Sequence, residues 1–118
     1  MNSADVGALG ERLALELLKS RGYEMEVRNF RAQRCEIDII MRDGDTIVFV
    51  EVKTRRGERF GRGSEAVTLR KQRNIIKAAT AYLCENGLFD APSRFDVVVE
   101  IDLKTGRAQH FINAFEAI

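Results

Sequence analysis

The sequence predicts an α/β sandwich in which helices flank a mixed central sheet, with the element order α-β-β-β-α-β-β. Two segments with helical spacing of apolar residues and five short apolar segments between and after them predict this class. The chain of 118 residues is 45 % hydrophobic, which is enough for one domain, residues 1–118, with a substantial core.

Each predicted helix has an apolar face and recognisable ends. In residues 5–21 the apolar side chains recur at three- and four-residue spacing, and Gly22 is a stop signal. The second helix is predicted to begin after Thr68, a typical N-cap residue, and to run to Asn86, where Gly87 ends it. The basic side chains expected to face outward, opposite its apolar stripe, are Arg70, Arg73 and Lys77.

The predicted strands are residues 23–30, 36–41, 46–53, 94–101 and 108–112. The second and third strands are joined by Arg42-Asp43-Gly44-Asp45, a hairpin-type connection. The third strand is apolar on both faces, which predicts a central position with both faces covered. Residues 54–65 combine glycines with many charged residues and are predicted to form a mobile loop.

Three charged residues interrupt the two strands of this hairpin, namely Asp38, Glu51 and Lys53. Alternate side chains of a strand point to opposite faces, so Glu51 and Lys53 share a face. If the strands pair as the turn indicates, Asp38 lies within reach of Glu51. Carboxylates in apolar strands cost free energy unless they are paired, exposed at an edge or bound to a metal. Two carboxylates and an ammonium group together are the minimum set for holding Mg²⁺ against a phosphate.

A longer series of motifs surrounds these three residues. In chain order they are Gly10-Glu11 with Ala14, Asn29-Phe30-Arg31, Glu36-Ile37-Asp38, Val48-Phe49-Val50-Glu51-Val52-Lys53, Phe60-Gly61, Ala66-Val67, Lys71, Tyr82-Leu83 and Arg94-Phe95-Asp96-Val97-Val98. Together they resemble the YraN family of small bacterial proteins, itself similar to archaeal Holliday-junction resolvases. The pattern D-x(12)-E-x-K resembles the PD-(D/E)XK superfamily, whose fold is the restriction-endonuclease-like three-layer sandwich. One departure is Cys35, where the family usually has glycine.

The resemblance implies a metal-dependent nuclease that hydrolyses phosphodiester bonds in DNA, with branched or structured DNA as the expected substrate. Asp38, Glu51 and Lys53 would be catalytic, and Asp38 and Glu51 would hold Mg²⁺ or Mn²⁺ together with Glu11. Glu11 is included because the related resolvases place a helix glutamate beside the metals; its pattern alone predicts a solvated helix residue. Glu36 and Gln72 are expected to surround the ligands without binding the metal.

The charge distribution indicates a polyanionic partner, although the net charge is only +1. Residues 53–77 carry a net charge of +7 and the remainder −6. A basic segment that begins at the acidic residues could follow a nucleic-acid backbone; a solvated basic loop and helix face is the alternative. The residues expected to bind nucleic acid, which the resemblance implies is DNA, are Arg31, Arg55, Arg56, Lys71 and Arg73. Arg31 could instead pair with Glu36.

Other features bear on where the protein is located and on its cysteine and histidine residues. No apolar run approaches the roughly 20 residues of a membrane span, and no signal peptide is recognised, so a cytoplasmic protein without membrane contact is expected. Cys35 and Cys84 have no metal-binding spacing and are predicted to be small buried residues. His110 is expected to be a half-exposed strand residue.

Two alternatives to the nuclease remain at this level. The chain could be a non-catalytic nucleic-acid-binding module that retains the nuclease fold, or an adaptor whose charged regions bind another protein. Symmetric cleavage of a four-way junction would require a homodimer, for which the edge of the last strand is a candidate surface.

Overall fold

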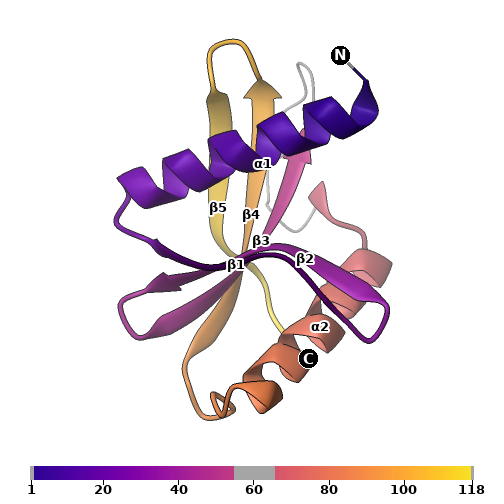
Figure 1. The fold of residues 1–118 in the computed structure, drawn as a ribbon, viewed down its shortest axis with the longest axis vertical. Coiled ribbons are helices and arrows are strands. Elements are labelled where there is room, and N and C mark those ends of the chain that lie inside the picture. Colours follow the sequence, from indigo (N-terminus) through magenta and orange to yellow (C-terminus); the bar gives the residue numbers. More distant parts are fainter. Residues whose placement is uncertain (1, 55–65, 118) are drawn as a thin grey trace.

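The computed structural model of the chain describes residues 2–54 and 66–117 (Figure 1). Their elements are α1 (Ser3–Ser20), β1 (Glu24–Ala32), β2 (Cys35–Asp43), β3 (Thr46–Thr54), α2 (Leu69–Glu85), β4 (Ser93–Asp102) and β5 (Arg107–Phe115). The predicted order α-β-β-β-α-β-β is confirmed. Except for Thr54, the predicted loop 54–65 lies outside the described residues.

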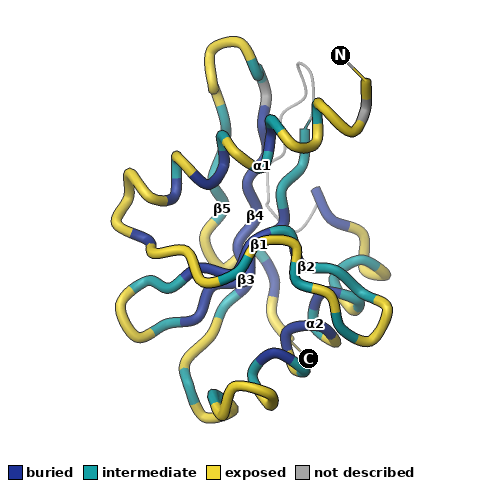
Figure 2. The backbone as a smooth tube through the Cα atoms, viewed as in Figure 1, coloured by how far each residue is buried: buried dark blue, intermediate teal, exposed yellow. Residues whose placement is uncertain are grey.

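The five strands form one sheet in the order β1-β2-β3-β4-β5. Three of the strand pairs are antiparallel and β3–β4 is parallel, so the sheet is mixed as predicted. A parallel pair needs a crossover connection, which α2 provides. The central position predicted for β3 is confirmed, and its residues 47–50 are buried (Figure 2).

The helices cover opposite faces of the sheet, which gives the predicted three layers. Under α1, Ala14 and Leu18 pack in a cluster that includes Val50. Under α2, Ile75 packs in the larger cluster together with Phe49. Alternate residues of β3 therefore point to opposite helices, as a strand covered on both faces requires.

Both helices begin at side-chain caps. The Asn2 side chain accepts a hydrogen bond of 2.9 Å from the main-chain nitrogen of Asp5, and Asp5 completes a capping box. Thr68 caps α2 by accepting from the nitrogen of Lys71 at 3.2 Å, which confirms the predicted start. The caps fix where α1 and α2 begin, and with them the positions of Glu11 and Lys71.

Three predictions about exposure and strand length are wrong. Cys84 is exposed because it lies in the last turn of α2, outside the buried stripe of that helix. Cys35, the first residue of β2, is partly exposed. His110 is partly exposed as a residue, but its side chain, which was expected to be half-exposed, is fully buried because it contacts the buried carboxylate of Asp96. The last strand extends to Phe115 instead of residue 112. Neither described helix is long and apolar enough to cross a membrane.

Candidate active site

The acidic residues lie where β2 and β3 separate. The ladder between these strands runs from the pair Asp43–Thr46 to the pair Ile39–Val50 and ends there. In the same register, the next two residues would be Asp38 and Glu51. Beyond this point β2 continues to pair with β1, and β3 continues to pair with β4. We call this opening the fork; it lies between two strands that are each held in place from their outer side.

Asp38 is fixed across the fork. Its Oδ2 accepts a hydrogen bond of 2.8 Å from the main-chain nitrogen of Val52. A strand nitrogen left by the end of a ladder needs an acceptor, and the carboxylate supplies one. The predicted closeness of Asp38 and Glu51 is therefore confirmed, although the carboxylate replaces part of the ladder instead of following it.

Glu51 is a buried carboxylate that lacks a hydrogen bond on one side. It is 3 % exposed, and its Oε2 has no hydrogen-bond partner among the described residues. The Nζ atoms of Lys53 and Lys71 lie 3.9 and 3.7 Å from Oε2, within ion-pair range but too far for hydrogen bonds. Burial raises the pKa of Glu51, and the hydrogen bond and charge of Asp38 raise it further, whereas the two lysines lower it.

Glu11 reaches the same site from α1. Burial raises its pKa, and the negative charge of Asp38 raises it further. Asn29 links Glu11 to the strands: with its amide oriented to satisfy both neighbours, its nitrogen donates to Glu11 Oε1 at 2.9 Å and to Glu36 Oε1 at 3.2 Å. Asn29 has a φ of +52°, a left-handed conformation that asparagine tolerates better than most residues.

Gly10 brings α1 close to the sheet beside this site. A Cβ atom at Gly10 would lie 2.8 Å from Thr54 Oγ1 and 3.8 Å from Glu100 Cγ. Only glycine fits at such a distance without a shift of the helix or of Thr54. The neighbouring residue, Glu11, is thereby brought to the fork.

The remaining predicted site residues are partly gathered here. Nε of Arg31 lies 3.5 Å from Oε2 of Glu36, which confirms the pairing alternative, and the Arg31 side chain is 80 % exposed.

The predicted residues of α2 differ in their distance from the fork. Lys71 lies beside Glu51, so it belongs to the fork as well as to the basic face of α2. The Gln72 amide donates to the carbonyl of Val67 at 3.0 Å and fixes the start of α2. Arg73 is exposed on α2. Arg55, Arg56 and the Phe60-Gly61 pair lie outside the described residues.

The donor set fits one divalent cation shared by two carboxylates. In the part of the chain that the structure describes, no three His, Cys, Asp or Glu side chains form a group that could hold a metal. Asp38 and Glu51 form a pair, however, and Oε2 of Glu51 is a buried carboxylate oxygen that accepts no hydrogen bond within the described residues. Mg²⁺ is often bound by one or two carboxylates, with water and substrate phosphate as its other ligands. The pair therefore suits this ion.

A second polar cluster was not predicted. Asp96 is fully buried and accepts from Arg94 Nε and the nitrogen of Asn113, both at 3.0 Å, and lies 2.8 Å from His110 Nε2. Burial alone would raise the pKa of Asp96, but the hydrogen bonds from His110, Asn113 and Arg94 lower it. The cluster ties β4 to β5, and its only sequence signal is an aspartate in an apolar strand.

Glu100 is a further buried carboxylate. It is 1 % exposed, and within the described chain neither of its oxygens has a hydrogen-bond partner. Burial raises its pKa to about 7. It lies opposite Thr54 in the parallel β3–β4 pair, on the α1 side of the sheet.

Comparison with known proteins places the chain in a family. A family model described as "Uncharacterised protein family UPF0102" matches residues 10–101. The chain belongs to the UPF0102 family. This is the YraN family, so the predicted membership is confirmed. The matched region includes Glu11, the fork and both helices' inner faces.

Several relatives match over most of their length. A UPF0102 protein of Geotalea uraniireducens is 48 % identical over 117 residues, covering 98 % of this chain and 92 % of that protein. A UPF0102 protein of Symbiobacterium thermophilum is 50 % identical over 96 residues, 81 % of each chain. A UPF0102 protein of Clostridioides difficile is 41 % identical over 115 residues, covering 98 % of this chain and 100 % of that protein. None of these descriptions names an activity.

Proposed function

We propose that this UPF0102 protein is a divalent-metal-dependent nuclease that hydrolyses phosphodiester bonds in DNA. One observation carries the proposal: the buried Glu51, whose Oε2 accepts no hydrogen bond within the described chain, lies beside Asp38 where two strands separate. Two carboxylates kept this close repel each other unless a proton or a cation lies between them. A structural role alone would be served as well or better by apolar residues, because replacing a buried ion pair with apolar side chains of similar volume is often neutral or stabilising.

Mg²⁺ or Mn²⁺ would be held by Asp38 and Glu51, with Glu11 as a third acidic group beside Asp38. When bound, such an ion polarises a phosphoryl oxygen and lowers the pKa of its water ligand. The Val52 hydrogen bond holds the Asp38 carboxylate in one orientation before the ion arrives. This pre-organisation reduces the cost of assembling the site.

Lys53 and Lys71 supply positive charge from two different layers. Lys53 comes from β3 and Lys71 from α2, and both Nζ atoms lie within 4 Å of the same oxygen, at 3.9 and 3.7 Å from Glu51 Oε2. With a cation on Glu51, each ammonium group is free to interact with the scissile phosphate or with the attacking water. Lys53 is the proposed catalytic lysine, and it stabilises negative charge that develops in the transition state.

The substrate is proposed to follow the basic face of α2. Arg70 and Arg73 are exposed on this helix, and in the chain they lie one residue before and two residues after Lys71 at the fork. Contacts of this kind are made to phosphates, so binding would weaken steeply with salt and carry little sequence preference. Branched or structured DNA is the preferred class because of the sequence resemblance to Holliday-junction resolvases, and two subunits would then cut two strands.

The test is cleavage of labelled four-way junction, single-stranded and duplex DNA in Mg²⁺ and Mn²⁺, using wild type beside Asp38→Ala and Lys53→Ala. Cleavage by the wild type that is lost in both variants is the expected result. Binding without cleavage by the wild type would overturn the nuclease and leave the non-catalytic module. Equal cleavage by all three proteins would mean that the fork is not the active site.

A further inference from the structure

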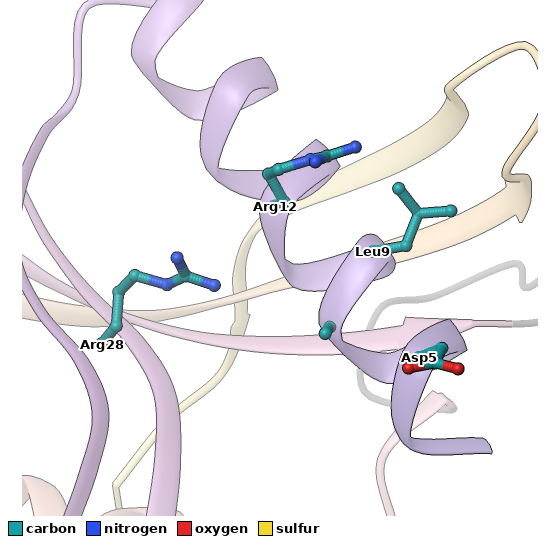
Figure 3. A pocket seen from close by; sticks show the side chains of 5 residues that line it. Asp5, Leu9, Arg12 and Arg28 are labelled. Atoms are coloured by element: carbon teal, nitrogen blue, oxygen red, sulfur yellow. The ribbon is translucent and has the colours of Figure 1, made fainter. Parts of the chain in front are cut away.

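A pocket of about 570 Å³ lies between α1 and β1, on the α1 side of the fork (Figure 3). It is lined by Asp5, Ala8, Leu9, Arg12 and Arg28. The first four recur at three- and four-residue spacing, so they form one face of α1. Arg28 comes from β1 and lies opposite Ile39, which packs under α1, so its side chain points to the same side of the sheet.

The two arginines give the lining of this pocket a net positive charge. Within the described residues neither Arg12 nor Arg28 forms an ion pair or a side-chain hydrogen bond, and both are exposed. The one acidic residue among those that line the pocket, Asp5, accepts from the main-chain nitrogen of Asn2 in the capping box of α1, so the lining carries two positive charges and one negative charge. Figure 3 shows Arg28 extending from its strand towards α1. Asp5 lies further along that helix, seven residues before Arg12.

The pocket adjoins the proposed active site. Arg12 directly follows Glu11 in α1. Arg28 precedes Asn29, whose amide connects Glu11 to Glu36. The two arginines therefore lie next in the chain to the residues that border the fork on the α1 side.

We propose that Arg12 and Arg28 bind the phosphodiester backbone of DNA where it leaves the fork on the α1 side. The inference deepens the proposed function and rests on it. Guanidinium groups suit this task because they bind phosphate oxygens through two parallel hydrogen bonds. Leu9 and Ala8 add apolar surface to the lining of the pocket, against which a sugar can pack. The substrate then contacts both helical layers: α2 on one side of the fork and the Arg12–Arg28 pocket beside α1 on the other.

The test is the affinity for a fluorescent four-way DNA junction measured over a series of salt concentrations in Mg²⁺. All proteins carry Asp38→Asn so that the DNA stays intact. The variants are Arg12→Ala with Arg28→Ala, Arg70→Ala with Arg73→Ala, and Lys19→Ala as the control. Lys19 is an exposed cation in the last turn of the same helix, two turns from the pocket.

Loss of both pocket arginines is expected to weaken binding and to reduce the slope of log affinity against log salt by about 2, roughly 1 for each phosphate contact. Lys19→Ala is expected to leave both values unchanged. An unchanged slope in the pocket variant, beside reduced binding in the Arg70–Arg73 variant, would overturn the pocket and leave the nuclease intact. Failure of every protein to bind DNA would overturn the proposed function as well.

Discussion

The carboxylate of Asp38 accepts a hydrogen bond of 2.8 Å from the main-chain nitrogen of Val52, the residue that follows Glu51. The bond joins β2 to β3 at the point where their ladder has ended. It thus has two consequences: it satisfies a strand nitrogen, and it holds one carboxylate beside another. Holding the two carboxylates together destabilises the fold because they repel each other, and a bound cation would offset this repulsion.

Substitutions at Asp38 should separate its structural contribution from its proposed chemical one. Asp38→Ala leaves the Val52 nitrogen without an acceptor and is expected to destabilise the fold by about 1–3 kcal/mol. Asp38→Asn keeps an acceptor oxygen and should be the more stable variant. Urea unfolding in EDTA measures the difference; equal stability of the two variants would contradict the importance of this bond. Neither variant should cleave DNA.

Glu51→Gln should abolish the response of the protein to metal. In wild type, Mg²⁺ is expected to raise Tm, because a ligand that binds only the folded state stabilises it. Glu51→Gln should be more stable than wild type in EDTA at pH 8, because the raised pKa of Glu51 means that its ionised form is unfavourable in the folded state. The same variant should show no increase in Tm with Mg²⁺.

The control for this experiment is Glu16→Gln, because Glu16 is an exposed glutamate on α1. It should retain the full increase in Tm with Mg²⁺. An increase that persists in Glu51→Gln would show that the ion binds elsewhere.

Glu100 should make stability depend on pH. Its pKa is raised to about 7 from 4.5, so between these values the folded state keeps a proton that the unfolded state has released. The contribution of Glu100 to the free energy of unfolding therefore falls as pH rises through this range, by up to about 3 kcal/mol. Glu100→Gln should be more stable than wild type at pH 8 and nearly equal to it at pH 4.5. Chemical unfolding at both pH values tests this, and an equal difference at the two would contradict it.

Two glycines of α1 should respond in opposite ways to alanine. A Cβ atom added at Gly7 would meet no other atom within 4 Å, so Gly7→Ala should stabilise the helix by about 0.5–1 kcal/mol. At Gly10 the added methyl group meets Thr54 Oγ1 at 2.8 Å, and Gly10→Ala should destabilise by about 1–3 kcal/mol. Thermal unfolding of both variants provides the comparison. If Gly10→Ala were as stable as Gly7→Ala, the close approach of α1 would be wrong.

Much of this architecture could be predicted because local patterns determine it. Apolar spacing gives α1 and α2, and the turn at Gly44 sets the register that brings Asp38 towards Glu51. The end of the ladder could not be predicted, because it depends on the outer strands that hold β2 and β3 apart. The contact of Lys71 with Glu51 likewise depends on where the crossover helix packs.

The wrong predictions concern residues whose partners are distant in sequence. The His110 side chain is buried because Asp96, on the neighbouring strand, accepts its hydrogen bond, and a histidine in an alternating strand carries no sign of this. Asp96 and Glu100 both interrupt an apolar strand, yet only Asp96 has hydrogen-bond donors around it in the described structure. Composition cannot distinguish these two cases, whereas the packing of neighbouring strands does.

The most direct test of the proposed nuclease is the single-turnover rate at which wild type and Asp38→Asn cleave the same DNA junction in Mg²⁺. Asp38→Asn retains the side-chain oxygen that faces Val52, so its fold should match that of wild type. We expect measurable cleavage by wild type and a loss of at least about 100-fold in the variant, the scale of removing one charged group that acts in the transition state. Equal rates, or no cleavage by the wild type on any DNA, would contradict the proposed nuclease.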